Sequence, residues 1–220
     1  MPQLRHLPHV SGDLLFNSAA GPEHGGIPVV APWFATTLGS EMHGWAESLP
    51  WTPSGLGSEL AHDGLRLHFT ARGLEFSLTC RNEDQRVRRV QLALHPYWAV
   101  DTRSASVSGV DGAEYFDKTD GQMKRFSGAV TFGDEVDFVF RTQSELLLHD
   151  AHRTLTLTPT GVDHMVVWNP GPVECATAES LGDDDWLRFV CVEPALLGPE
   201  RDGVDLAPGE SVEIALKVQV

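Results

Sequence analysis

Hydrophobic and polar residues alternate one by one along much of this chain. In residues 65–70, Leu65, Leu67 and Phe69 are separated by Arg66 and His68. The same period of two recurs in four further segments, at residues 74–79, 90–95, 154–158 and 211–220. Because successive side chains of a strand point to opposite faces of a sheet, this period predicts strands with one buried face.

Short turn sequences separate the alternating segments. Asp-Gly pairs occur at 63–64, 111–112 and 120–121, and Thr-Gly and Pro-Gly pairs occur at 160–161 and 208–209. No window of a dozen residues has the spacing of an amphipathic helix, and no repeat or linker interrupts the pattern. The sequence therefore predicts one all-β domain over residues 1–220, built as a β-sandwich or a barrel.

The composition indicates a globular chain without membrane segments. Hydrophobic residues make up 41% of the 220 residues, which is enough for a sizeable core. No apolar run is long enough to span a bilayer, and residues 1–6 do not have the pattern of a secretory signal. Cys80, Cys175 and Cys191 form no CxxC pair, so we expect neither a disulfide framework nor a zinc ribbon. These features favour a cytoplasmic protein with no membrane partner.

The formal net charge of −15 excludes nucleic acid as a natural partner, because phosphate contacts need clustered Lys and Arg. The one dense basic stretch, residues 86–89 (RVRR), precedes an alternating segment and contains no aromatic residue. We interpret it as a solvated strand end or turn.

Residues 21–53 differ from the rest of the chain, since they contain Gly, Pro and Trp with little alternation. A long irregular segment in a compact domain usually serves a site or a lid. Four short motifs therefore draw attention, two of them in this segment: GGIPVVAPWF (25–34), HGW (43–45), LALHPYW (92–98) and FVCVEPA (189–195).

Two titratable residues end predicted strands within these motifs. Glu193 shares one face with Phe189 and Cys191, and a carboxylate in such an apolar run is either functional or a strand-end residue emerging into solvent. His95 lies beside Tyr97 and on the face opposite Leu94. An imidazole next to aromatic rings suits a sugar site, although a hydrogen-bonded structural histidine fits the same pattern.

Other candidates carry a weaker signal. His43 lies in the irregular segment, Asp137 opens an aromatic strand or ends a turn, and Trp168 with Asn169 ends a valine run before a proline. A metal site has little support, because His149 and His152 have a helical spacing in an expected turn and the His-x-His pattern of cupins is absent. No P-loop, dinucleotide-binding glycine motif or serine nucleophile elbow is present.

Taken in this order, the motifs resemble those of the aldose 1-epimerase superfamily, most closely its hexose-6-phosphate mutarotase branch. The matching segments are GGIP (25–28), PWF (32–34), HGWA (43–46), LALH (92–95), VDFVF (136–140), VWNP (167–170) and CVE (191–193). They cover most of the chain from Gly25 to Ala195. The resemblance implies a large antiparallel β-sandwich of the galactose mutarotase type, with its site on the concave face of a sheet.

The resemblance also implies roles for individual side chains. Glu193 matches the family's catalytic base, and His95 matches its catalytic acid. His43 and Asp137 match further substrate-binding groups. We also expect contacts with the sugar from His24, Trp45, Trp168 and Asn169.

Two positions depart from the phosphate-specific branch. The arginine that precedes GGIP in that branch is His24 here, and the arginine that closes its HGFAR motif is replaced by Glu47 and Ser48. Arginine can donate two parallel hydrogen bonds to one phosphate, so these changes predict a weaker preference for hexose 6-phosphates. The chain is also shorter before Gly25 and around 49–60, which predicts a sheet edge that is open or covered by a partner.

The expected activity is mutarotation of a small-molecule sugar, a hexose or hexose 6-phosphate, by general acid/base ring opening. A carboxylate and an imidazole can supply this chemistry near neutral pH, so neither cofactor nor metal is needed. The alternative is a non-catalytic carbohydrate-binding or regulatory module on the same fold. Glu47 and the two missing arginines favour that alternative, whereas the pair His95 and Glu193 favours the enzyme. A metal-dependent cupin-like isomerase is the third and weakest interpretation.

Overall fold

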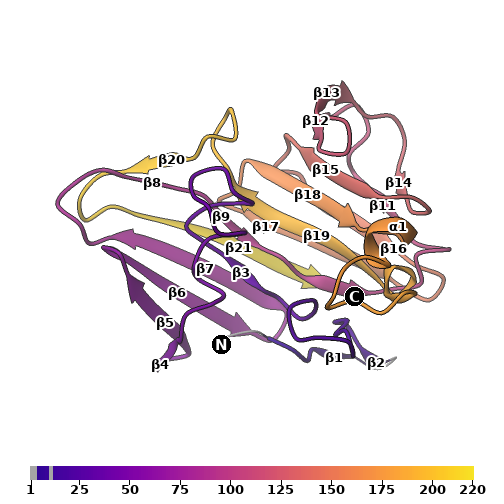
Figure 1. Cartoon of the computed structure of the whole chain (residues 1–220), viewed down its shortest axis with the longest axis horizontal. Coiled ribbons are helices and arrows are strands. Elements are labelled where there is room, and N and C mark those ends of the chain that lie inside the picture. The colour runs from indigo at the N-terminus through magenta and orange to yellow at the C-terminus, as the bar shows by residue number, and fades with distance from the viewer. Residues whose placement is uncertain (1–3, 10–11) are drawn as a thin grey trace.

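The computed structural model describes residues 4–9 and 12–220, and nearly all its regular structure is β-strand (Figure 1). Residues 1–3, part of the start judged to lack a secretory signal, lie outside the described residues. Two large sheets contain most of the strands, and every strand pair in the described ranges is antiparallel. The predicted antiparallel β-sandwich is confirmed.

The first large sheet has nine strands and contains the clearest alternating segments. In sheet order the strands are β14 (Val130–Thr131), β11 (Ser106–Ser108), β16 (Leu146–His149), β17 (Thr154–Thr160), β21 (Ser211–Gln219), β7 (Glu75–Asn82), β6 (Leu65–Arg72), β5 (Gly57–His62) and β4 (Thr52–Ser54). Buried and exposed positions alternate along β6, β7, β17 and β21, as their sequences predict.

The second large sheet has eight strands and carries four of the eight predicted site residues, Asp137, Trp168, Asn169 and Glu193. In sheet order its strands are β13 (Gln122–Arg125), β12 (Glu114–Asp117), β15 (Val136–Phe140), β18 (His164–Asn169), β19 (Phe189–Leu196), β9 (Leu92–Leu94) and β3 (Val29–Val30), while β10 (Tyr97–Ala99) also pairs with β19. Unlike β6 or β7, β18 and β19 are buried almost throughout. These two strands are therefore covered on both faces.

One face of each large sheet contributes to a shared hydrophobic core. Leu67, Leu78 and Leu216 of the nine-stranded sheet belong to the same buried cluster as Val190 and Val192 of β19. The opposite face of β19 belongs to other clusters. Figure 1 looks onto the faces of the two sheets. Burial of side chains of this size contributes about 1.5–3 kcal/mol each, so this core holds the two layers together.

The remaining regular elements are short. The strand pairs β1 (Pro8–His9) with β2 (Gly12–Asp13) and β8 (Arg88–Val90) with β20 (Val204–Leu206) form two small sheets. One α-helix, α1 (Gly171–Cys175), and one 3₁₀ helix, Asp185–Leu187, lie between β18 and β19. Within the described part of the chain, no helix has the length and apolar character needed to cross a membrane.

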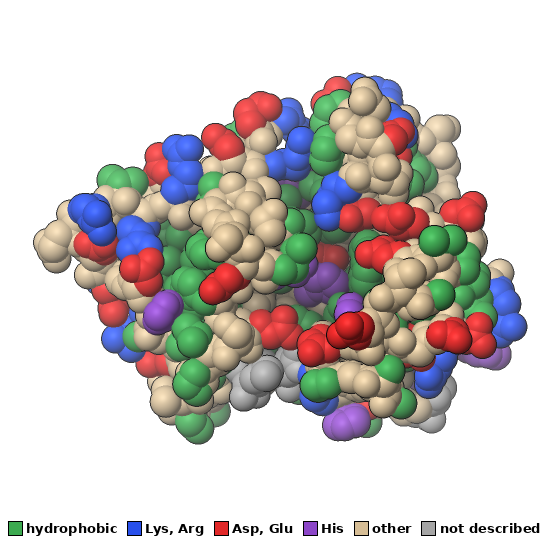
Figure 2. Space-filling model, in the orientation of Figure 1, with side chains coloured by type: hydrophobic (Ala, Val, Ile, Leu, Met, Phe, Trp, Pro, Cys, Tyr) green, Lys and Arg blue, Asp and Glu red, His purple; other side chains and the backbone are tan. Residues whose placement is uncertain are grey.

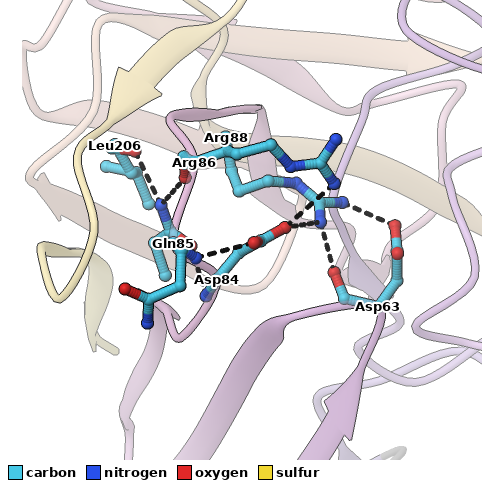
Figure 3. A network of polar contacts seen from close by, with 7 residues as sticks. Asp63, Asp84, Gln85, Arg86, Arg88 and Leu206 are labelled. Atoms are coloured by element: carbon cyan, nitrogen blue, oxygen red, sulfur yellow. Dashed lines mark hydrogen bonds and ion pairs between the residues drawn. The ribbon is translucent and has the colours of Figure 1, made fainter.

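The turn between β5 and β6 shows how local sequence sets the sheet. Asp63 and Gly64 have φ angles of 46° and 72°, and positive φ at both central residues defines the tight hairpin turn that an Asp-Gly pair favours. Arg88 donates hydrogen bonds to the backbone and carboxylate of Asp63 and to Asp84, while Arg86 also pairs with Asp84 (Figure 3). The basic stretch at 86–89 is thus engaged with nearby carboxylates at a strand end.

The predicted strand at 90–95 is wrong in one respect, because it is divided between two sheets. Its first part pairs with β20 as β8, and its second part pairs with β3 and β19 as β9. The buried Gln91 lies at the break, where it accepts a hydrogen bond from Phe34 N–H and donates to the carbonyls of Leu197 and Arg201. A side-chain amide can replace the missing strand partners there, which hydrophobic alternation does not reveal.

Candidate active site

The eight-stranded sheet has a cavity of about 450 Å³ on the face that points away from the shared core. This volume lies in the range of small-molecule sites. Figure 2 shows the face with a hollow near its centre, where histidine and acidic side chains gather. A larger hollow, of about 660 Å³, lies beside Asp101 and Arg188, but it is shallow and no charged side chain in its lining is buried. The smaller cavity is therefore the better candidate site.

Glu193 reaches the cavity because of its position on β19. The strand points Val190 and Val192 toward the shared core and Phe189 and Cys191 toward the other face, so Glu193 also faces the cavity. Its side chain is 1% exposed, and its Oε2 has no hydrogen-bond partner. A buried carboxylate oxygen without a partner is costly to keep in a fold, and such groups are frequent at functional sites.

His95 follows β9 and lies directly against this carboxylate. Its Nε2 is 3.3 Å from Glu193 Oε1, and its backbone N–H donates to the Pro28 carbonyl. The imidazole stacks on the Tyr97 ring at 5.0 Å between centroids, and its Nδ1 has no hydrogen-bond partner. The structure therefore brings together the two residues that the resemblance assigns as acid and base.

Burial controls the protonation of this pair. Burial raises the pKa of Glu193 well above its usual value, and the nearby Asp137 carboxylate raises it further. Burial also lowers the pKa of His95 well below its usual value, with a further contribution from His43. Both shifts disfavour the charged forms, so the empty cavity favours a neutral imidazole and a protonated carboxyl over an ion pair.

His43 adopts a backbone conformation that only a few non-glycine residues accept, with a φ of 61°. The backbone N–H of His43 donates a hydrogen bond to the Ala35 carbonyl. The backbone N–H of Ala35 donates in turn to the ring Nδ1 of His43, at 3.3 Å. These bonds fix the neutral tautomer that carries its proton on Nε2. Burial, together with Lys118, lowers the pKa of His43 to about 4. His43 is therefore a neutral imidazole beside His95, with 5.5 Å between the ring centroids.

Asp137 lies on β15 and points into the same cavity, where it pairs with Lys118. Burial raises the pKa of Asp137, and Lys118 opposes that shift. Lys118 was not predicted from the sequence. It follows β12, and the register that aligns Asp117 with Phe138 brings it beside Asp137. No local motif indicates this pairing, because it depends on how two strands align.

Aromatic rings form one wall of the cavity. Trp168 on β18 contacts the ring of Tyr97 at 6.1 Å and the imidazole of His95 at 5.7 Å between centroids. His24 stacks near Trp168, and its Nδ1 is 2.6 Å from Ser180 Oγ. Such a wall offers apolar surface to the C–H face of a sugar ring. His24 and Trp168, both predicted sugar contacts, line the cavity, and their contact with a sugar stays a prediction.

Two predicted contact residues lie outside the cavity lining. Trp45 is 6% exposed, belongs to the shared core and packs edge-on against His62. Asn169 is fully buried, and its side chain bonds to the carbonyls of Trp186 and Phe189 and accepts from Gly171 N–H. Both predictions are corrected here: these two side chains stabilise the fold, while His43, two residues before Trp45, and Trp168, next to Asn169, line the cavity.

Several lining residues were not among the predicted site residues. Besides Lys118 they include the carboxylates Glu23, Glu47 and Glu174 and the apolar residues Phe34 and Met42. Glu47 and Phe34 lie in recognised motifs, whereas Glu174 belongs to the short helix α1, which no sequence signal announced. Among residues 4–9 and 12–220, no group of three His, Cys, Asp or Glu side chains is arranged to hold a metal ion.

Comparison with known proteins agrees with the fold. The model of the aldose 1-epimerase family matches residues 18–219. Two proteins named "Putative glucose-6-phosphate 1-epimerase" are similar in sequence. The one from Cenchrus ciliaris is 27% identical, over 84% of this chain and 67% of its own, and the one from Salmonella typhimurium is 30% identical, over 77% and 66%. The chain thus spans about two thirds of the length of these relatives.

Solved structures show the same architecture. A crystal structure titled a "putative mutarotase" from Salmonella typhimurium matches with a TM-score of 0.78 and 25% identity, over 94% of this chain and 80% of its own. A galactose mutarotase-like protein from Lactobacillus casei matches with a TM-score of 0.73 and 13% identity, over 99% and 93%, and supports the fold alone. The family match, which extends over nearly the whole described chain, shows that this protein belongs to the aldose 1-epimerase family, a family of isomerases.

Proposed function

We propose that the chain is a mutarotase that interconverts the α and β anomers of an aldose, with His95 and Glu193 as its catalytic pair. The observation that carries the proposal is the unpartnered Oε2 of Glu193, buried at a sugar-sized cavity and next to the His95 imidazole. The three free cysteines are all buried, which agrees with a reducing, cytoplasmic location for this reaction.

The reaction balances when the pair holds one proton, and it starts from the form that carries this proton on His95. Burial disfavours this charge-separated form in the empty cavity, so the bound sugar has to stabilise it. Glu193, as carboxylate, takes the proton of the anomeric hydroxyl while the C1–O1 double bond forms. His95, as imidazolium, gives its proton to the ring oxygen as the C1–O5 bond breaks. Rotation about C1–C2 presents the other face of the aldehyde, and the reverse transfers close the ring. Each positioned group contributes about 10² to 10⁴ in rate.

Other residues position the sugar in this proposal. His43 offers a neutral Nε2–H donor, and the Asp137 carboxylate accepts hydrogen bonds from sugar hydroxyls. Lys118 pairs with that carboxylate and opposes the rise in its pKa that burial causes. Trp168 and Tyr97 pack against the apolar face of the ring.

The test is exchange NMR of anomer interconversion on wild-type protein and on Glu193→Gln and His95→Asn. Each substitution should slow catalysed exchange by at least about 10²-fold, while sugar binding weakens much less. Glu213→Gln, on the outer face of the nine-stranded sheet, is the matched control and should exchange at the wild-type rate. Near wild-type exchange in Glu193→Gln would exclude it as the base. Binding without exchange above the spontaneous rate would identify a carbohydrate-binding module instead.

A further inference from the structure

Among the residues that the structure describes, Lys118 is the one lysine or arginine that lines the catalytic cavity. Its ammonium group pairs with the Asp137 carboxylate, and its side chain is 33% exposed. The ammonium also lies over the Phe34 ring, 5.7 Å from the ring centroid. A carboxylate and the face of an aromatic ring both attract a cation, so these two contacts hold a flexible side chain at the cavity.

A second lysine in the same β12–β13 hairpin has a purely structural environment. Lys124 on β13 pairs with two carboxylates, Asp117 and Asp120, and lies outside the cavity lining. Lys118 differs, because Asp137 is the one hydrogen-bond acceptor of its ammonium in the described part of the chain. An ammonium group has three N–H donors. After its bond to Asp137, Lys118 therefore keeps two donors for the oxygen atoms of a ligand in the cavity.

The strand order places this ion pair on one side of the catalytic residues. β12, which Lys118 follows, is next to β15 with Asp137; then come β18, β19 with Glu193, and β9, which His95 follows (Figure 1). Asp137 is directly opposite Trp168 of β18. Two strand spacings, about 10 Å, separate β15 from β19. Glu193 thus has His95 on one side and the Lys118–Asp137 pair on the other, with the Trp168 ring in between.

This order orients the sugar ring in the proposed mechanism. Glu193 takes the proton of O1 and His95 gives a proton to O5, so the O5 side of the ring faces His95. In a pyranose the ring carbon opposite O5 is C3, and C2 lies between C1 and C3. The 2- and 3-hydroxyls therefore face the side of the cavity that holds Lys118 and Asp137.

The charge of Lys118 reaches both members of the catalytic pair. Burial raises the pKa of Glu193, and Lys118 opposes that rise. Burial lowers the pKa of His95, and Lys118 is among the charges that lower it further. Coulomb interactions weaken with distance, so these effects agree with a position of the ammonium beside the same bound ring.

We propose, on the basis of the proposed function, that Lys118 is a specificity-determining residue, whose ammonium donates a hydrogen bond to the 2- or 3-hydroxyl of the sugar beside the hydroxyl bound by Asp137. A donor and an acceptor held side by side fit two adjacent hydroxyls, because each hydroxyl can donate and accept. A site that hydrogen-bonds a hydroxyl rejects an analogue without it, since its own polar group loses a partner. The preferred substrate class is thus an aldose with hydroxyls at both C2 and C3.

The experiment measures catalysed anomer exchange by NMR for glucose, 2-deoxyglucose, 3-deoxyglucose and 6-deoxyglucose. Each kcat/KM is divided by the spontaneous exchange rate of the same sugar, because loss of a hydroxyl near C1 also changes the uncatalysed reaction. We expect 2-deoxyglucose or 3-deoxyglucose to be about 10- to 100-fold poorer than glucose for the wild-type protein, as for the loss of a hydrogen bond to a charged group.

Variants connect this discrimination to the ammonium group. Lys118→Met should lower kcat/KM by about 10-fold or more for glucose and 6-deoxyglucose. The deoxy sugar that lacks the bound hydroxyl should lose much less, so its disadvantage against glucose largely disappears. Lys118→Gln keeps an N–H donor near Asp137 and should give the same pattern if Lys118→Met does not fold. Lys124→Met is the matched control from the same hairpin and should leave the ratios between the sugars unchanged.

Two results would overturn the inference and leave the mutarotase proposal intact. The first is equal wild-type kcat/KM for glucose, 2-deoxyglucose and 3-deoxyglucose, because neither hydroxyl on that side of the ring would then be bound. The second is an equal loss for all four sugars in the Lys118 variants, which would show that Lys118 acts only as the partner of Asp137. Failure of the proposed function looks different, since no sugar would then exchange above its spontaneous rate.

Discussion

The outward faces of the two large sheets have opposite characters. On the nine-stranded sheet the outward positions of β17 are Thr154, Thr156 and Thr158, which face solvent between buried leucines. On the eight-stranded sheet the corresponding positions of β19 are Phe189, Cys191 and Glu193, all of them buried. Two layers of one sandwich thus use their outer faces differently, one for contact with water and one for a site.

The difference shows on which sheet the fold keeps polar atoms that are buried without a hydrogen-bond partner. Charged and polar groups on the nine-stranded sheet find exposed partners, as Glu213 does with Thr79. On the eight-stranded sheet Glu193 and His95 keep unpartnered polar atoms in a buried setting. Surface polar pairs contribute little to stability, whereas buried unsatisfied groups are costly. The cost therefore falls on the residues that the proposed chemistry needs.

The largest expected effect concerns a buried polar residue on the cavity side. Gln91→Leu would leave Phe34 N–H and the carbonyls of Leu197 and Arg201 without their partners. We expect the free energy of unfolding to fall by about 3 kcal/mol in urea titrations, because these groups are buried. Thr156→Ala, on the outer face of the other sheet, should change it by less than about 0.5 kcal/mol. Similar losses for both variants would remove the contrast between the faces.

A second test uses pH and the depressed pKa of His43. This pKa is about 4 in the folded protein and about 6.5 in an unfolded chain. Between these values the unfolded chain binds more protons, so this residue lowers the stability as pH falls from 6.5 to 4, by up to about 3 kcal/mol. At neutral pH His43 is neutral in both the folded and the unfolded chain, so its titration does not change the stability there.

Unfolding titrations at several pH values would measure that slope. His43→Asn should remove its own part of the slope, since asparagine does not titrate and tolerates the positive φ at this position. A variant with the same pH dependence as the wild type would show that His43 is not held neutral by the fold.

The smallest expected effect is a gain in stability. The pKa of Glu193 is raised in the folded protein, so its contribution to stability declines as pH rises from about 4.5 toward the folded value. Glu193→Gln cannot ionise and should be about 1 kcal/mol more stable than the wild type at pH 8, with a smaller difference below pH 4.5. Glu213→Gln should stay within about 0.5 kcal/mol at both pH values. A Glu193→Gln protein that is less stable at pH 8 would contradict this account.

Sequence reasoning succeeded where one face of a strand meets water. Alternation located β6, β7, β17 and β21, since their exposed faces are polar. It was less informative for the eight-stranded sheet, where β18 and β19 are buried on both faces and read as continuous apolar runs. The alternation pattern also predicted one strand where the structure has two, β8 and β9. The buried Gln91 between them has the same place in the pattern as an exposed polar residue of an alternating strand.

The site was predictable from motifs and not from periodicity. His43, His95, Asp137 and Glu193 were assigned through the family resemblance, and all four line one cavity. Their catalytic and binding roles stay predictions. Residues brought in by strand register, such as Lys118, carry no signal in the local sequence. The sequence also did not show which residue of a motif faces the cavity. In the HGW motif this choice between His43 and Trp45 depends on the conformation of the loop.

The strand order has a consequence for synthesis on the ribosome. β21 lies between β7 and β17 in one sheet, and β19 lies between β9 and β18 in the other. Both central strands come from residues 189–219, so neither layer can close until nearly all the described chain has been made. Until then β7 and β17 would expose unpaired edges to other nascent chains. The protein therefore completes its fold late, through contacts between distant parts of the chain, as expected for a slowly folding β-protein.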